Sequence, residues 1–445
     1  MQINSPGSHM RCLGIDIGSS SIKGAVLNLQ SGQVESIAKE PFPDPLRGLP
    51  SGFHEVDPAL VLSRTIAVIR ALLADASDVR KIFFCGQMGG IILTDAAARP
   101  VTNYLSWRDQ RSLRPLDEST TPLIEEIEHR LSPTLFADLG RELKPGSATV
   151  LLHWLARHKQ LPGGTIPVSI GDFVVGNLCG IAPTMHRTHT IGMLNFRTAD
   201  WHREAFKVLG IDQLNWPKLA DDHVPVGQCE IEGRMLDLYT VMGDQQAALK
   251  GIQLSKEELS INVSTGSQVS QITSEFQPSN CQTRCWFGTD YLNTVTHIPA
   301  GRSLTVIEAL LTELPRAAGI TVPNSWKLIS EATERANGDG LSCDLSFFAS
   351  AMGNSGRIDQ ITTENLTVGN LFQAAFEFMA DSYLTCSQRL SVTPAWSRIA
   401  VSGGLVQAFP SLRQKLQKRF AMPMREVAEQ EETMMGLLYW AREVV

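Results

Sequence analysis

A short unit of two strands joined by a loop of small residues occurs twice in this chain of 445 residues. More than half of the sequence separates the glycine of the first loop, Gly18, from that of the second, Gly266. The strand, loop and returning strand are 13–17, 18–21 and 22–29 in the first copy and 259–263, 264–267 and 268–273 in the second. Small-residue loops between apolar runs are typical of hairpins. The repetition predicts two related halves that face each other across a cleft.

Strands and helices alternate over the rest of the chain, and this alternation predicts an α/β fold. Apolar residues at helical spacing predict helices at 58–74, 304–314 and 368–389, among others. Three further runs of strand length each end in glycine; they are Lys81–Cys85 before Gly86, Asp237–Met242 before Gly243, and Arg398–Ser402 before Gly403.

The composition limits the partners of this chain. Apolar residues make up 43% and charged residues 19%, which is typical of globular proteins. The net charge is −7 and no basic run occurs, which argues against general affinity for nucleic acid or anionic membranes. No window approaches the ~20 apolar residues of a membrane span, and no secretory signal is evident. We therefore expect a cytoplasmic protein with neither a nucleic-acid nor a membrane partner; a homodimer is left open.

Cysteine and histidine offer no metal chemistry by their spacing. The eight cysteines include no C-x-x-C pair, which favours reduced thiols over a disulfide framework or a zinc site. The histidines likewise show no zinc-ligand spacing. Residues 1–10, which end in Gly7-Ser8-His9-Met10, look like the remnant of a cleaved expression tag and are left out of the fold reasoning.

The two small-residue loops are suited to binding phosphate groups. Backbone N–H groups exposed by glycine and serine can surround the oxygens of a triphosphate, because no bulky side chain stands in the way. One such hairpin alone is usually only a turn, but two in corresponding places favour a nucleotide site. The predicted contacts are Gly18, Ser19, Ser20 and the nearby charge of Lys23 in the first half, and Thr265, Gly266 and Ser267 in the second.

Two carboxylates lie at strand ends beside these loops. Phosphoryl transfer needs a cation to neutralise the phosphates and a base to orient the attacking hydroxyl. Asp16, which precedes the first loop, is suited to hold Mg²⁺ through water. Asp244, which follows Gly243 at a strand-to-helix turn, is suited to act as the base. Either aspartate taken alone would more simply be a helix cap.

Seven segments, taken together, resemble the FGGY family of carbohydrate kinases over 11–445. They are similar to the family's first phosphate segment, sugar loop, W-x-D-x-R segment, catalytic segment, second phosphate loop, adenosine loop and closing helix. In that order they are Gly14–Lys23, Gly86–Met88, Trp107–Arg111, Gly243–Ala248, Ser264–Ser267, Ser402–Gly404 and Glu432–Gly436.

The resemblance implies two actin-like (ribonuclease H-like) domains, 11–242 and 243–445, with ATP, Mg²⁺ and a small sugar meeting in the cleft between them. It implies Asp244 as the catalytic base, and Asp16 and Asp244 as ligands of the metal. The implied sugar contacts are Gln87, Met88, Gly89, Trp107, Asp109, Asp244 and Gln245. The implied nucleotide contacts are Asp16, Gly18, Ser19, Ser20, Lys23, Thr265, Gly266, Gly403 and Gly404.

Several of these side chains have a second interpretation. Asp109 and Arg111 could bind sugar hydroxyls or simply pair with each other. Trp107 could contact the sugar or belong to the core, and Met88 could pack rather than touch the substrate.

Three positions depart from the family pattern: Gln360 in place of glycine, Leu151 in place of lysine, and Gly89 where histidine often follows Met88. A glycine at position 89 removes a polar contact and leaves room for a longer sugar. The amino-acid sequences of segments 243–249, 259–270 and 361–371 look most like those of the sedoheptulokinases in the family. We therefore predict ATP-dependent phosphorylation of sedoheptulose at its terminal hydroxyl.

Three other functions compete with this prediction. A kinase of the same family could act on a pentulose, such as xylulose or ribulose, or on a polyol. An actin-like ATPase switch or chaperone would hydrolyse ATP without regard to sugars, and it gives no account of 86–89 and 107–109. A silent sugar sensor would not need Asp16, Asp244 and both phosphate loops.

Overall fold

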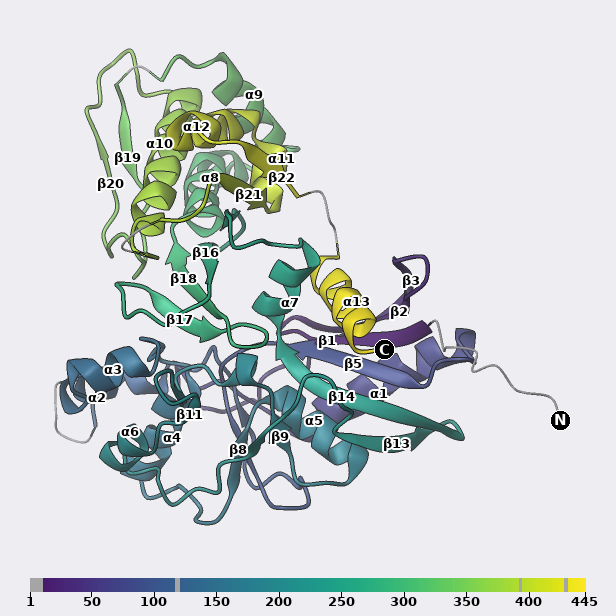
Figure 1. The fold of residues 1–445 in the computed structure, drawn as a ribbon. Helices are drawn as coiled ribbons and strands as arrows, with labels where there is room; N and C mark the ends of the chain where they lie inside the picture. The colour runs from purple at the N-terminus through teal and green to yellow at the C-terminus, as the bar shows by residue number, and fades with distance from the viewer. Residues whose placement is uncertain (1–10, 117–120, 339, 392–393, 428–430) are drawn as a thin grey trace. The chain divides into compact units, whose positions relative to one another are not determined.

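The computed structural model describes residues 11–116, 121–338, 340–391, 394–427 and 431–445, so the predicted tag remnant lies outside it. Two compact units are present. Unit 1 comprises 1–253, 283–289 and 429–445, and unit 2 comprises 254–282 and 290–428. Figure 1 shows strands and helices alternating along the chain, which confirms the predicted α/β class.

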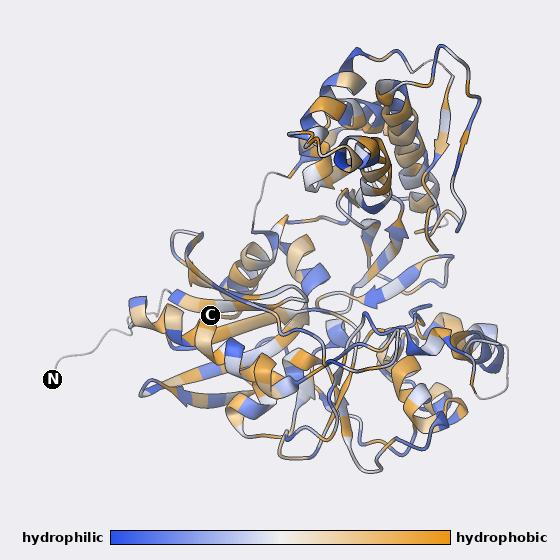
Figure 2. Cartoon of the chain, turned by 180° about the vertical axis from the view of Figure 1, so that it is seen from behind, coloured by the Kyte–Doolittle hydropathy of each residue, from blue (hydrophilic) through white to orange (hydrophobic). Residues whose placement is uncertain are grey.

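Unit 1 is built on a six-stranded sheet in the order β13-β14-β5-β1-β2-β3. The strands are β1 (Arg11–Ile17), β2 (Ser21–Asn28), β3 (Gln33–Pro41), β5 (Lys81–Gly86), β13 (Gly227–Ile231) and β14 (Arg234–Gly243). β1, β5 and β14 are parallel neighbours and lie side by side in Figure 1. In Figure 2 the central strands of this sheet are mostly in the hydrophobic colour, as expected for strands covered on both faces.

Alternation along β1 and β2 assigns each residue to one face of the sheet. A Cβ added at Gly24 would meet Leu72 and Val68, so that face packs on α1. A Cβ added at Gly14 would meet Leu437 of α13, so the opposite face packs on the C-terminal helix. Asp16 follows Gly14 at the two-residue period and therefore lies on the α13 face, as does its antiparallel partner, Lys23.

Helices α7 and α13 contact each other very closely in unit 1. A Cβ added at Gly251 of α7 would lie 1.9 Å from the carbonyl oxygen of Glu432, and one added at Gly436 of α13 would lie 1.9 Å from that of Ala247. Only glycine permits this approach of two backbones. The contact fixes α7, the helix that begins at Asp244. It explains why the structural division differs from the predicted boundary at 242: α7 and the C-terminal helix both pack with unit 1.

The remaining elements of unit 1 are short strands and helices. The helices are α1 (Pro58–Asp75), α2 (Leu123–Arg130), α3 (Pro133–Asp138), α4 (Ala148–Arg157), α5 (Ile170–Cys179), α6 (Arg203–Val208), α7 (Asp244–Gly251) and α13 (Glu432–Val444), with 3₁₀ turns η1 (Arg111–Leu113) and η2 (Arg187–His189). The short strands are β4 (Glu55–Val56), β6 (Ile92–Thr94), β7 (Tyr104–Leu105), β8 (Ile166–Val168), β9 (Thr184–Met185), β10 (Leu194–Asn195), β11 (Asp200–Trp201) and β12 (Lys218–Leu219).

A second six-stranded sheet, in the order β17-β18-β16-β15-β21-β22, contains the strands of unit 2 and also β17, of which residues 283–285 are grouped with unit 1. Its strands are β15 (Glu258–Asn262), β16 (Ser267–Thr273), β17 (Gln282–Cys285), β18 (Tyr291–Ile298), β21 (Arg398–Ser402) and β22 (Met424–Glu426), beside the small pair β19 (Ser342–Asp344) and β20 (Arg357–Asp359). The helices are α8 (Gly301–Ala317), α9 (Ser325–Arg335), α10 (Val368–Ser387), α11 (Gly404–Ala408) and α12 (Pro410–Phe420). The buried α10 gives the core of unit 2 Phe372, Phe376, Met379 and Tyr383.

The two sheets repeat one pattern, as the duplicated hairpin predicts. In unit 1, β3-β2-β1-β5-β14 are neighbours, with antiparallel pairs on the β2 side of β1 and parallel pairs on the β5 side. In unit 2, β18-β16-β15-β21-β22 follow the same order with the same directions. The hairpin β1–β2 therefore corresponds to β15–β16, and β5 corresponds to β21. Within the described residues, no helix combines the length and apolar character needed to cross a membrane.

Candidate active site

The carboxyl ends of β1, β5 and β14 bring several predicted site residues together in unit 1. Ile17 pairs with Gly86, and Gly86 pairs with Gly243, so the three strands end at the same level. Asp16 lies just before that level, and Asp244 follows it directly. Parallel strands with this topology commonly carry a ligand site at their carboxyl edge.

Asp244 has an unusually basic carboxylate. It is the first residue of α7, and its Oδ1 accepts a hydrogen bond from the backbone N–H of Gln245 at 2.8 Å. Burial, followed by the negative charge of Asp16, raises the pKa of Asp244 to about 7, while Arg284 opposes the shift. A carboxylate with a pKa near the working pH is well matched to accept a proton.

Asp16 has one satisfied and one unsatisfied oxygen. Thr433 Oγ1, from the first turn of α13, donates to Asp16 Oδ2 at 2.9 Å. Asp16 Oδ1 is buried and forms no hydrogen bond of ordinary geometry within the described part of the chain, although the Cys85 thiol, a weak donor, also interacts with this carboxyl. Burial is the largest influence on this carboxyl and raises its pKa, although the hydrogen bond from Thr433 and the charge of Lys23 act against it. An unpaired, buried carboxylate oxygen is a suitable ligand for a hard divalent cation such as Mg²⁺.

The predicted first phosphate loop is held by its own hydrogen bonds. The Gly18 N–H donates to the carbonyl of Ser21 at 3.1 Å, and Arg108 Nη2 donates to Ser19 Oγ at 3.1 Å. Ser20 is exposed. Lys23 Nζ forms an ion pair with Glu431 at 2.7 Å, so its charge is shared with the residue before α13. Arg108 therefore brings a second cation to this loop, which the sequence analysis did not assign.

The predicted sugar loop lies at the end of β5. Gln87 is 2% exposed; its Nε2 donates to the Gly18 carbonyl at 3.4 Å, and its Oε1 accepts from Tyr104 at 3.2 Å. Met88 lies against Gly243, because a Cβ added at Gly243 would meet Met88 Sδ at 2.7 Å. The loop thus contacts both the phosphate hairpin and the strand that leads to Asp244.

Gly89 and Trp107 are neighbours at this loop. Gly89 has φ +80°, and a Cβ added there would lie 3.1 Å from Trp107 Cβ. This left-handed backbone is a conformational reason for glycine at position 89, independent of the size of any substrate. Trp107 is 40% exposed, and Arg108 lies 5.4 Å from its ring centroid, so its side chain is open to a ligand rather than sealed in the core.

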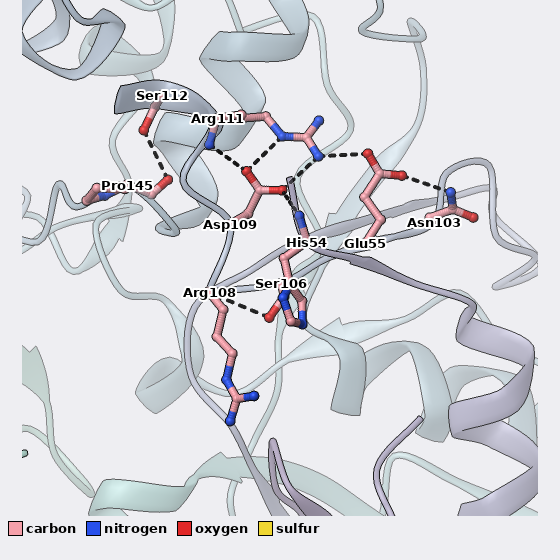
Figure 3. A network of polar contacts seen from close by, with 9 residues as sticks. All are labelled: His54, Glu55, Asn103, Ser106, Arg108, Asp109, Arg111, Ser112 and Pro145. Atoms are coloured by element: carbon pink, nitrogen blue, oxygen red, sulfur yellow. Dashed lines mark hydrogen bonds and ion pairs between the residues drawn. The ribbon is translucent and has the colours of Figure 1, made fainter. Parts of the chain in front are cut away.

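Asp109 and Arg111 pair with each other, the second of the two interpretations that the sequence leaves open (Figure 3). Asp109 Oδ1 accepts from Arg111 Nε at 2.9 Å, and Oδ2 accepts from Arg111 Nη2 at 2.8 Å and from the His54 N–H at 2.7 Å. Arg111 also pairs with Glu55 at 2.7 Å, and its guanidinium lies 4.2 Å from the Phe53 ring centroid. Asp109 is fully buried and bonds to both Arg111 and His54, so it holds the segment that carries Trp107 in place.

Gln245 has partners that the sequence analysis missed. Arg284 Nη1 donates to Gln245 Oε1, and Arg284 Nε pairs with Glu142 at 2.5 Å. Glu142 is 2% exposed, so the pair is largely shielded from solvent. These residues are far apart in the chain and belong to no motif, so the sequence carries no signal that links them.

In unit 2, the predicted second phosphate loop and adenosine loop are neighbours. β15 and β21 are parallel, with Asn262 opposite Ser402, so Thr265 and Gly266 follow one strand and Gly403 follows the next. Gly403 has φ +105°, and a Cβ there would lie 2.2 Å from the Val263 carbonyl oxygen. Added Cβ atoms at Gly266 and Gly404 would meet nothing within 4 Å, so both loops border open space.

Apart from Asp16 and Asp244, the described residues offer no candidate metal site. They contain no group of three or more histidine, cysteine, aspartate or glutamate side chains that could hold a metal ion. All eight cysteines are free thiols. A metal in unit 1 would therefore need water ligands beside Asp16 and Asp244.

The profile described as "FGGY family of carbohydrate kinases, N-terminal domain" matches residues 11–251. A xylulose kinase of Staphylococcus xylosus is 27% identical over 226 residues, which cover 48% of this chain and 44% of that protein. A glycerol kinase of Marinomonas sp. is 25% identical over 261 residues, which cover 54% of this chain and 50% of that protein. The chain therefore matches only about half the length of these curated relatives.

Solved structures match over a larger share of the chain. The xylulose kinase of Lactobacillus acidophilus has a TM-score of 0.83 at 17% identity and covers 98% of this chain and 89% of its own. The glycerol kinase of Plasmodium falciparum with ADP has a TM-score of 0.79 at 15% identity and covers 97% and 88%. At these identities the likeness shows the fold, which agrees with the actin-like sheets predicted for each half.

Proposed function

Because the chain belongs to the FGGY family of carbohydrate kinases, we propose that it transfers the terminal phosphate of ATP to a hydroxyl of a small ketose. The observation that carries the proposal is the pair of half-buried carboxylates, Asp16 and Asp244, at one sheet edge, where the pKa of Asp244 is raised to about 7. A general base of this kind is what hydroxyl attack on a phosphoryl group requires.

In the proposed reaction, Asp244 accepts the proton of the sugar hydroxyl as its oxygen attacks the γ-phosphorus. The bond from that phosphorus to the bridging oxygen breaks, and ADP leaves. Gln245 is held by Arg284 beside the base and is placed to contact the reacting end of the sugar. The remaining predicted sugar contacts are Gln87, Met88, Gly89, Trp107 and Asp109.

We propose that Mg²⁺ is held through water by Asp16 and Asp244. When bound, it neutralises charge on the phosphates. The unpaired Oδ1 of Asp16 supports this assignment. The loops at Gly18–Ser20 and Thr265–Gly266 are proposed to surround the triphosphate, with Gly403 and Gly404 beside the adenosine.

The substrate proposal is sedoheptulose, with a pentulose or polyol as the alternative. The resemblance of segments 243–249, 259–270 and 361–371 to sedoheptulokinases supports the heptulose. The relatives named above are a xylulose kinase and a glycerol kinase, which favour the alternative. The backbone requirement for glycine at position 89 weakens the argument from pocket length, because it accounts for Gly89 without a longer sugar.

A coupled ADP-release assay on sedoheptulose, xylulose, ribulose and glycerol tests both levels of the proposal. We expect Mg²⁺-dependent ADP release that each accepted sugar stimulates strongly, with the highest kcat/KM for sedoheptulose. If kcat/KM is higher for xylulose than for sedoheptulose, the alternative substrate, a pentulose, is favoured. ATP hydrolysis that no sugar or polyol changes would contradict the kinase itself and favour an ATPase switch.

A further inference from the structure

The last residues of β14 lack a strand neighbour on one side. β13 pairs with β14 only as far as Leu238, whereas β5 pairs with it as far as Gly243. Beyond Leu238, the backbone groups on the β13 side need other hydrogen-bond partners, because leaving buried N–H and C=O groups unpaired is costly. This exposed edge leads directly into Asp244.

The 3₁₀ turn η2 holds the Met242–Gly243 peptide group at this edge. The Gly243 N–H donates to Thr188 Oγ1 at 2.8 Å, and His189 Nε2 lies 3.0 Å from the Met242 carbonyl oxygen. Thr188 and His189 are 1% and 2% exposed. The N–H and the C=O of a trans peptide point in opposite directions, so two side chains of one turn hold this peptide group from both ends.

The contact from Thr188 continues into a chain of polar groups. Thr188 Oγ1 lies 2.6 Å from His186 Nδ1, and His186 Nε2 lies 2.6 Å from Asp222 Oδ1. Asp222 is in turn held through its backbone carbonyl, which accepts from Trp440 Nε1 at 3.2 Å. The chain thus runs from the C-terminal helix to the peptide that precedes Asp244.

Only one arrangement of hydrogens satisfies every contact in this chain. Asp222 as a carboxylate can only accept, so His186 carries its proton on Nε2. His186 Nδ1 accepts the Thr188 backbone N–H at 3.3 Å, so it carries no proton and also takes the hydroxyl hydrogen of Thr188. The lone pairs of Thr188 Oγ1 remain free to accept the Gly243 N–H. Each group therefore fixes the orientation of the next.

His189 works independently of this chain. Burial lowers its pKa to about 4, so the ring is neutral near pH 7 and its Nε2–H donates to Met242. Its Nδ1 has no partner within the described residues. The two contacts of η2 thus hold the N–H and the C=O of the same Met242–Gly243 peptide group.

We infer that Asp222, His186 and Thr188 form a positioning network that fixes the Met242–Gly243 peptide, directly before Asp244, and so aims the Asp244 carboxylate. The inference rests on the proposed function. Glycine gives the backbone at 243 unusual freedom, and the space beside it is needed by Met88 and Gln246, so a larger residue cannot rigidify it. Hydrogen bonds from outside the strand are the available means of restraint. A misplacement of about 1 Å in a reacting group can cost on the order of 100-fold in rate.

Thr188→Val tests the inference, because it keeps the shape and removes the hydroxyl. We expect kcat for the best sugar to fall on the order of 10- to 100-fold while KM for sugar and ATP stays within about 2-fold. Thr188→Ser restores the hydroxyl and should recover most of kcat. Thr190→Val is the matched control, because it also removes a buried hydroxyl from this segment, one that donates to the Arg187 carbonyl at 2.6 Å rather than contacting β14.

Amide hydrogen exchange at Gly243 gives a readout that does not depend on activity. Exchange should accelerate in Thr188→Val and return toward the wild-type rate in Thr188→Ser. If Thr188→Val does not fold, Asp222→Ala takes its place, with a smaller loss of kcat at unchanged KM. Wild-type kcat and Gly243 exchange in the folded variant would overturn the inference, as would equal losses in Thr188→Val and Thr190→Val. A wild-type enzyme that phosphorylates no sugar would instead overturn the proposed function.

Discussion

The two units share one sheet pattern, but the equivalent edge carries carboxylates in unit 1 and neutral side chains in unit 2. In unit 1, Asp16 ends the first strand of the hairpin with an unpaired oxygen, and Asp244 stands two strands away. In unit 2, the corresponding strand ends in Asn262, whose amide donates to Ser402 Oγ at 3.0 Å and whose oxygen accepts from Ser264 Oγ at 2.7 Å. The same loops occur in both units, whereas at this edge unit 1 carries two carboxylates and unit 2 carries the neutral side chains of Asn262 and Ser402. Under the proposed function, the reacting carboxylates therefore belong to unit 1, and nucleotide contacts are proposed for loops of both units.

The sharpest way to test this division is to remove the base. Asp244→Asn keeps the shape of the side chain but cannot accept a proton, so kcat should fall about 10²- to 10⁴-fold. Steady-state kinetics with the best sugar measures the loss. Asp212→Asn, which removes an exposed carboxylate of unit 1, serves as the control and should keep wild-type activity. A folded Asp244→Asn enzyme with kcat near wild type would take Asp244 out of this role.

A change in unit 2 should act on stability and nucleotide binding rather than on chemistry. Gly403→Ala forces a Cβ to within 2.2 Å of the Val263 carbonyl at φ +105°, so we expect a loss of roughly 3 kcal/mol in unfolding free energy. Denaturant unfolding measures this, and KM for ATP should rise in the same variant. Gly404→Ala meets nothing within 4 Å and should leave stability within about 0.5 kcal/mol. Equal stability of the two variants would contradict the geometry at Gly403.

Asp16→Asn makes the edge of unit 1 resemble that of unit 2. The substitution removes a proposed metal ligand, so the Mg²⁺ concentration for half-maximal activity should rise about 10-fold. It also removes a charge that raises the pKa of Asp244, so the acid limb of the kcat/KM profile should move to lower pH. A pH–rate profile at saturating Mg²⁺ separates the two effects. An unmoved acid limb would show that Asp16 does not act on Asp244.

The smallest expected effect concerns stability against pH. The pKa of Asp244 is about 7 in the folded chain against an ordinary value of 3.8, so the folded state retains a proton that the unfolded state releases. Stability from this group is therefore lost as pH rises from about 4 to 7. Asp244→Asn should melt a few degrees higher than wild type at pH 8 and equal to it near pH 4. A difference that does not change with pH would rule out the raised pKa.

Local sequence was enough to predict the hairpins, their glycine loops and the carboxylates at the strand ends, because each depends on residues close together in the chain. The partners of those carboxylates were not predictable. Asp16 meets Thr433, 417 positions away, and Lys23 meets Glu431, 408 positions away. Arg284 reaches Gln245 from a segment with no motif. Asp109 and Arg111 are neighbours in sequence, yet only packing decides that they bind each other rather than a ligand.

The return of α13 to unit 1 has a consequence for how the protein folds. Met434, Leu437, Leu438 and Trp440 complete the core beneath the first sheet, although unit 2 lies between them and that sheet in the sequence. Unit 2 is therefore an insertion within the sequence of unit 1, and the core of unit 1 cannot close until the chain has returned from unit 2. We expect a variant that lacks 431–445 to lose these core contacts together with the Thr433 hydrogen bond to Asp16, which denaturant unfolding would detect as a loss of stability.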